Sequence, residues 1–119
     1  MAEQLTAQGD RTREVYREDG ELIGLLRESG DLWIPCAVFG SALASPRGER
    51  AAEEFLLDHG LGYLADRWQL RESDDWVTVQ IVEARPLEVT VSYADYGHPA
   101  LFNSRKTLRD PGPAELRRE

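Results

Sequence analysis

The stretch that decides the fold is residues 12–39, TREVYREDGELIGLLRESGDLWIPCAVF. Two dipeptides, Asp19-Gly20 and Ser29-Gly30, divide it into three segments. Asp-Gly accepts the positive φ angles of a two-residue type I′ hairpin turn, and Ser-Gly accepts them less readily. We therefore predict a three-stranded antiparallel meander. Its strands are 12–18, 21–28 and 31–39.

The third of these strands is apolar on both faces, which indicates that it is sandwiched between other parts of the core. Pro35 lies in its middle, and proline cannot donate a hydrogen bond to a neighbouring strand. A bulge, or a strand that is paired on only one side at Pro35, would reconcile the two observations.

A helix is predicted over 47–59. Ser45 and Pro46 suit an N-cap and a first helical position, and Gly60 suits the residue after the last turn. Apolar residues recur at helical spacing and predict one buried stripe. They are Ala51, Ala52, Phe55 and Leu56.

Alternating apolar and polar residues predict a second meander after the helix. Its strands are 63–71, 76–84 and 87–93, with a short edge strand over 105–108. The expected fold class is α+β: a strongly twisted antiparallel sheet of two three-stranded meanders, barrel- or sandwich-like, with one central α-helix packed on it. We expect residues 1–11 to be a flexible lead, 12–109 a single domain, and 110–119 a flexible tail.

Composition restricts the class of partner. The 119 residues include 14 Lys and Arg against 22 Asp and Glu, which gives a net charge of −8. We expect no nucleic-acid partner, because nucleic-acid affinity depends on cations that displace counterions. A basic protein partner is compatible with this charge, and so is simple solubility. Lys106 is the only lysine, and the resulting arginine bias suggests a GC-rich coding genome.

We expect a cytoplasmic protein without membrane contact. The mean hydropathy is −0.49, no apolar run approaches the ~18 residues that a spanning helix needs, and residues 1–10 lack the basic and apolar regions of a secretory signal.

No motif specifies a catalytic chemistry. Cys36 lies between apolar neighbours in a predicted strand, where a thiol is usually an inert core residue. His59 lies in the last helical turn, where partial positive charge suits the helix dipole. His98 and Asp95 supply two metal-type ligands in a loop, without a known ligand spacing. We therefore predict no catalytic residue, no metal and no cofactor.

The segment 93–106 contains residues that break a strand pattern, and it also contains aromatic, acidic and basic side chains. Recognition loops on rigid scaffolds combine these features. We select six binding candidates from it: Tyr93, Asp95, Tyr96, His98, Phe102 and Arg105. The competing interpretation is a decorated turn that closes the last hairpin. Three tryptophans, Trp33, Trp68 and Trp76, are expected in the core or as contacts that cover a strand. The alternative is that they line an apolar pocket or an interface together with other aromatic residues: Tyr63, Tyr93, Tyr96 and Phe102.

Two function classes follow. The first is a small, non-catalytic interaction module that meets a basic protein partner, such as a bacterial accessory, antitoxin-like or immunity-like protein. The alternative is a small-ligand-binding protein or enzyme with an aromatic-lined pocket that uses the 93–106 loop. A flat acidic face would favour the first class, and a deep apolar pocket that receives Cys36 or His98 would favour the second.

Overall fold

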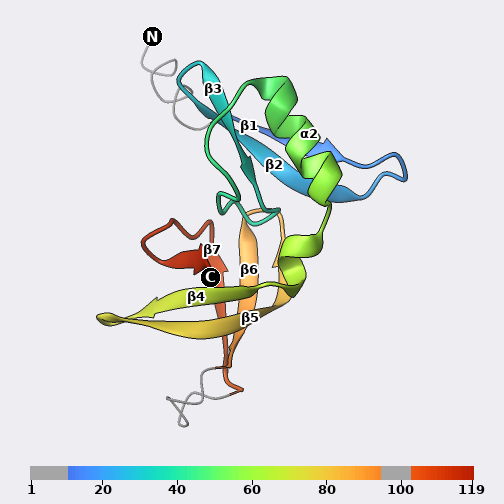
Figure 1. The fold of residues 1–119 in the computed structure, drawn as a ribbon. Coiled ribbons are helices and arrows are strands. Elements are labelled where there is room, and N and C mark those ends of the chain that lie inside the picture. The colour runs from blue at the N-terminus through green and yellow to red at the C-terminus, as the bar shows by residue number, and fades with distance from the viewer. Residues whose placement is uncertain (1–10, 95–102) are drawn as a thin grey trace.

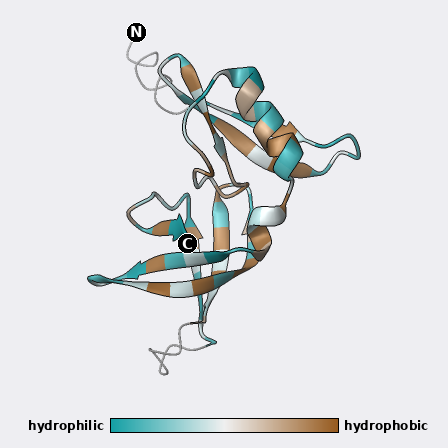
Figure 2. Ribbon diagram, viewed as in Figure 1, coloured by the Kyte–Doolittle hydropathy of each residue, from teal (hydrophilic) through white to brown (hydrophobic). Residues whose placement is uncertain are grey.

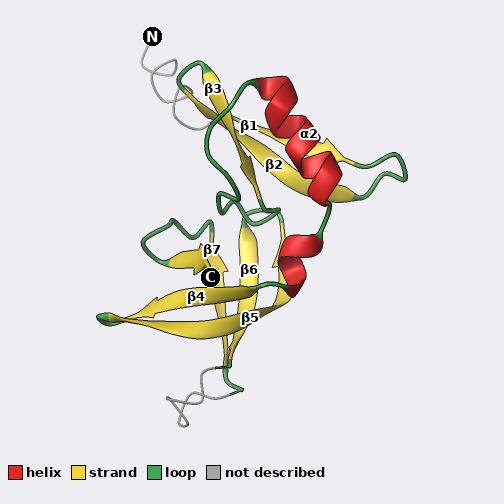
Figure 3. Cartoon of the chain, viewed as in Figure 1, coloured by secondary structure: helices red, strands yellow, loops and turns green. Residues whose placement is uncertain are grey.

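The computed structural model describes residues 11–94 and 103–119, and these form two antiparallel sheets and one α-helix (Figure 1). The first sheet has the strand order β1-β2-β3, and the second has the order β7-β6-β5-β4-β8. The predicted α+β class is confirmed, and neither sheet closes into a barrel (Figure 3).

The elements have the following bounds. The first sheet contains β1 (Thr12–Tyr16), β2 (Leu22–Ser29) and β3 (Leu32–Cys36). The helix α2 (Glu49–His59) and the 3₁₀ helix η1 (Gly62–Ala65) follow. The second sheet contains β4 (Arg67–Glu72), β5 (Asp75–Arg85), β6 (Glu88–Tyr93), β7 (Arg105–Arg109) and β8 (Leu116–Arg118).

The β1–β2 hairpin has a longer turn than predicted. The amide of Gly20 donates to the carbonyl of Arg17 at 2.9 Å, and Gly20 has a φ of 88°. Asp19 does not share a positive φ, which a type I′ turn would require of both central residues. The two-residue turn was therefore a wrong prediction; a three-residue turn that ends in a left-handed glycine connects the strands.

Pro35 is accommodated because β3 is an edge strand. It pairs with Leu26 of β2 on one side, while on the other its carbonyl accepts from the amide of Leu43 at 2.8 Å. Within the sheet β3 is thus paired only with β2, as the sequence suggested, and the returning segment contacts its other edge through isolated bridges.

The segment that returns along β3 also delays the start of the helix. Arg47 and Trp33 exchange two backbone hydrogen bonds of 2.7 and 2.9 Å, so Arg47 is extended rather than helical. The helix consequently begins at Glu49 with Gly48 as its N-cap, and the prediction of Ser45-Pro46 as the helix start was wrong.

The chain enters the second sheet later than predicted. The strand that was expected over 63–71 begins only at Arg67, because residues 62–65 form η1. The Tyr63 hydroxyl explains this local choice: it donates to the Ile23 carbonyl at 2.9 Å and accepts from the Val38 amide at 3.0 Å. Tyr63 therefore faces the first sheet instead of continuing β4.

The C-terminal residues contain a strand that the sequence did not predict. Strand β8 pairs with β4, and Leu116 is buried opposite Leu70. The expectation of a flexible tail over 110–119 is wrong for this strand. It pairs with a partner about 48 residues earlier in the chain, which no local pattern reveals. The predicted edge strand at 105–108 is present as β7.

One continuous core joins the two sheets. Phe39 makes edge-to-face contacts with Tyr63 and Trp68, at centroid distances of 6.0 and 5.3 Å. Hydrophobic and hydrophilic residues alternate along β4 and β5, and the hydrophobic set faces this core (Figure 2). The helix α2 covers β2 and β3, with Ala52 and Leu56 fully buried. That the described chain is a single domain stays a prediction.

Candidate functional site

The six binding candidates do not form one described site. Asp95, Tyr96, His98 and Phe102 lie outside the residues that the structure describes. Tyr93 is buried, and its hydroxyl donates to the carboxylate of Glu72. Burial and this hydrogen bond raise the pKa of Tyr93, so the phenol stays protonated at neutral pH.

Arg105 lies on the other face of the same sheet. It pairs with Ser92, whose neighbour Tyr93 points into the core, and successive strand residues face opposite sides. The structure therefore separates Tyr93 from Arg105.

Cys36 and His59 are both engaged in structural roles. Burial raises the pKa of the Cys36 thiol to about 11, so it is protonated and weakly nucleophilic at neutral pH. The ring of His59 stacks on Phe55 at 4.0 Å, and its Nδ1–H donates to the Phe55 carbonyl at 2.8 Å. The expected burial of Cys36 is confirmed, and His59 completes the end of α2.

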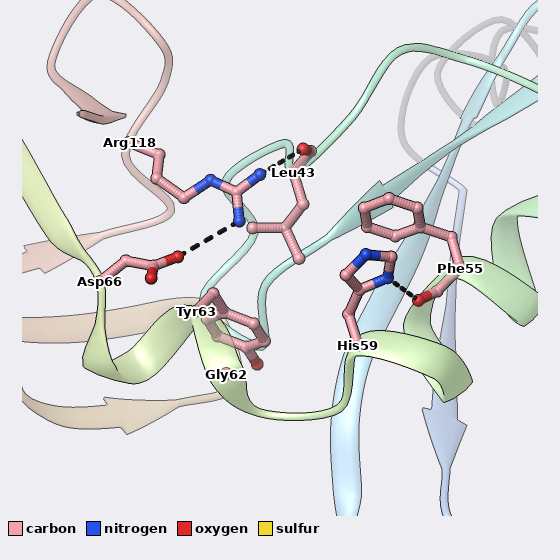
Figure 4. A pocket seen from close by; sticks show the side chains of 7 residues that line it. All are labelled: Leu43, Phe55, His59, Gly62, Tyr63, Asp66 and Arg118. Atoms are coloured by element: carbon pink, nitrogen blue, oxygen red, sulfur yellow. Dashed lines mark hydrogen bonds and ion pairs between the residues drawn. The ribbon is translucent and has the colours of Figure 1, made fainter.

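A pocket of about 220 Å³ lies where α2 and η1 meet the second sheet (Figure 4). Its polar groups already have partners within the protein. Arg118 contacts Asp66 at 3.4 Å and donates to the Leu43 carbonyl at 2.9 Å, and the Tyr63 hydroxyl donates to the Ile23 carbonyl in the first sheet. The arrangement stabilises the junction between the sheets and leaves few groups for a ligand.

A second cavity, of about 240 Å³, borders Cys36. Its lining is largely apolar and includes Ile34 and Leu116, and none of its described residues is aromatic. The hydroxyl of Ser41, also on this cavity, is buried without a hydrogen-bond partner among the residues described. The described residues of this lining include no histidine and no carboxylate, so none of them is placed to act as a base for the thiol.

The most distinctive charged feature is a surface formed by residues 12–21 and 49–59, which we call the hairpin–helix surface. These two segments hold eight acidic and three basic side chains, a net charge of −5 out of −8 for the whole chain. Arg13 joins the segments, because its guanidinium lies 3.0 Å from Glu49 and 3.1 Å from Glu53.

A groove of about 360 Å³ runs between the β1–β2 loop and α2 on this surface. Glu18, Asp19 and Leu57 line it together with Arg17, whose charge is already paired with Asp19 and Glu21. Leu57 is 45% exposed, a high fraction for a leucine. The groove thus combines carboxylates with an uncovered apolar side chain.

Three carboxylates of the hairpin–helix surface have no cationic partner among the described residues: Glu14, which accepts a hydrogen bond from the Tyr16 hydroxyl, Glu18 and Asp58. Among residues 11–94 and 103–119, no Arg, Lys or His nitrogen lies within 4 Å of Glu18 or Asp58. The sequence shows that both segments have an excess of acidic residues. It does not show that the two segments are in contact, because this contact depends on how α2 crosses the first sheet.

Two further features of the described residues bear on membrane insertion and metal binding. No helix among them is both long enough and apolar enough to cross a membrane. Nor do three or more His, Cys, Asp or Glu side chains converge there as metal ligands. Comparisons with protein-family models, curated proteins and solved structures give no match, so the charge and shape of these surfaces are the basis for a function.

Proposed function

We propose that this protein is a non-catalytic interaction module whose hairpin–helix surface binds a basic segment of a protein partner. The observation that carries the proposal is the groove between the β1–β2 loop and α2, where Glu18 and Asp19 flank the exposed Leu57. Charge complementarity accelerates encounter and gives specificity, while a desolvated apolar contact contributes affinity.

The proposed occupant is a short Lys- or Arg-rich segment with one apolar side chain. Its cations would meet Glu18 and Asp58, which form no ion pair with another described residue, and its apolar side chain would cover Leu57. The free, buried Cys36 is compatible with a reducing compartment, and a cytoplasmic location is part of the proposal.

The alternative of an aromatic-lined ligand pocket draws less support. The aromatic rings in the Figure 4 pocket, Phe55 and Tyr63, are packed against His59 and Phe39. Their polar neighbours are bonded to the protein itself, as described above.

The test is a binding titration with a fluorescent peptide of alternating Arg and Leu, followed by anisotropy at 150 mM salt. The site variant is Glu18→Gln/Asp19→Asn/Asp58→Asn. Its control, Asp74→Asn/Asp75→Asn/Glu83→Gln, removes the same charge from exposed residues of the second sheet.

We expect the site variant to bind at least tenfold more weakly and the control to stay within twofold of the unaltered protein. Equal weakening in both variants would show that only net charge attracts the peptide. Absence of binding to the unaltered protein would also refute the proposal.

A further inference from the structure

The outer face of the five-stranded sheet carries a second charged surface, of the opposite sign. Residues that alternate with the buried Trp68, Leu70, Val77 and Val79 point away from the core. We call their basic part the arginine face: Arg67, Arg71, Arg105 and Arg117, around Trp76. The pairing Arg67–Gln80–Ser92–Arg105 crosses four strands, and Arg71 pairs with Trp76 while Arg117 pairs with Gln69.

These four arginines differ from most others in the protein because they form no ion pair. Among residues 11–94 and 103–119, only Arg47 shares this property. At the far end of the same face, Arg85 and Arg109 are each 3.7 Å from a glutamate.

Two glutamates flank the arginine face without neutralising it. Glu115 and Glu119 lie beside Arg71 and Arg67 in the β8 register, joined by backbone hydrogen bonds of 2.9 and 3.0 Å. Their carboxylates remain beyond 4 Å from those guanidinium groups.

Trp76 orients two of the guanidinium groups. Arg117 lies 3.9 Å from the ring centroid, and its Nε donates to Gln69 at 2.9 Å. Arg71 lies 5.6 Å from the same centroid, and its Nε donates to the Ser73 carbonyl at 3.1 Å. Both groups are thus held through Nε, and their terminal nitrogens have no partner among the residues described. A group that is already oriented loses less entropy when it binds.

Such guanidinium groups bind oxyanions, because their terminal N–H groups match the two oxygens of a carboxylate or phosphate. Arg67 and Arg71 are four residues apart on β4, a spacing of ~13 Å along a strand. An extended peptide repeats its side chains with the same period, so acidic residues at every second or fourth position meet this spacing.

Acidic peptide suits the surface better than nucleic acid does. Arg117 and Arg71 already occupy the ring of Trp76, where a stacked base would lie. The net charge of −8 also disfavours a dense polyanion. The hairpin–helix surface belongs to the other sheet of a molecule 47 Å long, and a Debye length of about 8 Å screens it from a short peptide.

We propose that the arginine face is a docking surface for an extended, acidic segment of a partner protein. This site is separate from the hairpin–helix surface, and it selects an acidic partner where that surface selects a basic one. Its test is therefore independent of the function proposed above.

The test uses a fluorescent twelve-residue peptide of alternating Glu and Thr, followed by anisotropy at 50 and 150 mM salt. The site variant is Arg67→Gln/Arg71→Gln/Arg105→Gln/Arg117→Gln. The control is Arg11→Gln/Arg50→Gln/Arg85→Gln/Arg109→Gln, which removes the same charge from exposed arginines that are each paired with a glutamate. Urea unfolding midpoints establish that both variants are folded.

We expect at least a tenfold loss of affinity in the site variant and less than a twofold change in the control. Arg117→Lys, which keeps the charge but loses the planar group stacked on Trp76, should weaken binding about threefold or more. Binding should also quench Trp76 fluorescence, and Trp76→Phe identifies that signal.

Three results would overturn the proposal. One is the absence of binding to the unaltered protein at 50 mM salt. Another is an equal loss in the site variant and the control. The third is tighter binding of a single-stranded oligonucleotide that the site variant abolishes, which would assign the face to nucleic acid.

Discussion

Cys36 lies at the end of β3 with a thiol that burial keeps protonated, and its pKa rises from 9.0 to about 11. The unfolded chain ionises at the lower value, so this contribution to stability is fully present below pH 9 and is lost as the pH rises through 11. We predict that the free energy of unfolding falls by up to about 1.4 kcal/mol per pH unit more steeply than in Cys36→Ala over this window.

Urea titrations of both proteins at pH 8, 9, 10 and 11 measure this difference. Comparison with Cys36→Ala removes the background from Tyr63, whose pKa burial also raises, to about 12. Parallel curves for the two proteins would mean that the thiol reaches water without unfolding.

Single residues also show where prediction from sequence stops. The burial of Cys36 and the helix-end position of His59 follow from their neighbours in the chain. The arginine face does not: Arg105 was selected as a loop residue, and its companions Arg67 and Arg117 were not selected at all. They share one face only through the pairing of β4 with β8 and, across β5 and β6, with β7, which is long-range information.

Among the elements, strand β8 gives the sharpest test, because local sequence and tertiary pairing disagree about it. Leu116 is 1% exposed, so Leu116→Ala should lower the free energy of unfolding by about 2–5 kcal/mol, as other large-to-small core changes do. Urea denaturation measures the change, with Leu57→Ala on the exposed side of α2 as the control, expected to be within about 0.5 kcal/mol of the unaltered protein. An unchanged urea midpoint for Leu116→Ala would contradict the pairing of β8 and would support the flexible tail that the sequence predicted.

Most other elements were predictable from the period of their apolar residues and from the turn residues between them. The alternation in β5 and β6 and the apolar stripe of α2 each indicate a type of structure locally. Within that stripe Ala52 and Leu56 are buried and Phe55 is partly buried, whereas the predicted burial of Ala51 was wrong, because Ala51 is exposed. Errors arose where a tertiary contact overrode the local signal. Arg47 is drawn into a bridge with Trp33, which shortens the helix, and the hydroxyl of Tyr63 bonds to the first sheet, which delays β4.

For the whole molecule, we predict one cooperative unfolding transition. Neither sheet covers its own apolar face, and the core that joins them passes through Phe39, Tyr63 and Trp68. Tryptophan fluorescence and far-UV circular dichroism should therefore give coincident urea curves. Tyr63→Phe, which removes the hydroxyl bonded to Ile23 and Val38, should shift both curves together. Two resolved transitions would show that the sheets are independent domains.

The separation of charge between the two sheets has a consequence for the molecule in solution. The hairpin–helix surface has a net charge of −5, and the arginine face carries four guanidinium groups without an ion pair among the described residues. The protein therefore has a permanent electric dipole in addition to its net charge. A charged surface therefore aligns it before any contact forms. At neutral pH, well above its isoelectric point near 4.8, the protein would therefore bind an anion exchanger with the hairpin–helix surface toward the resin.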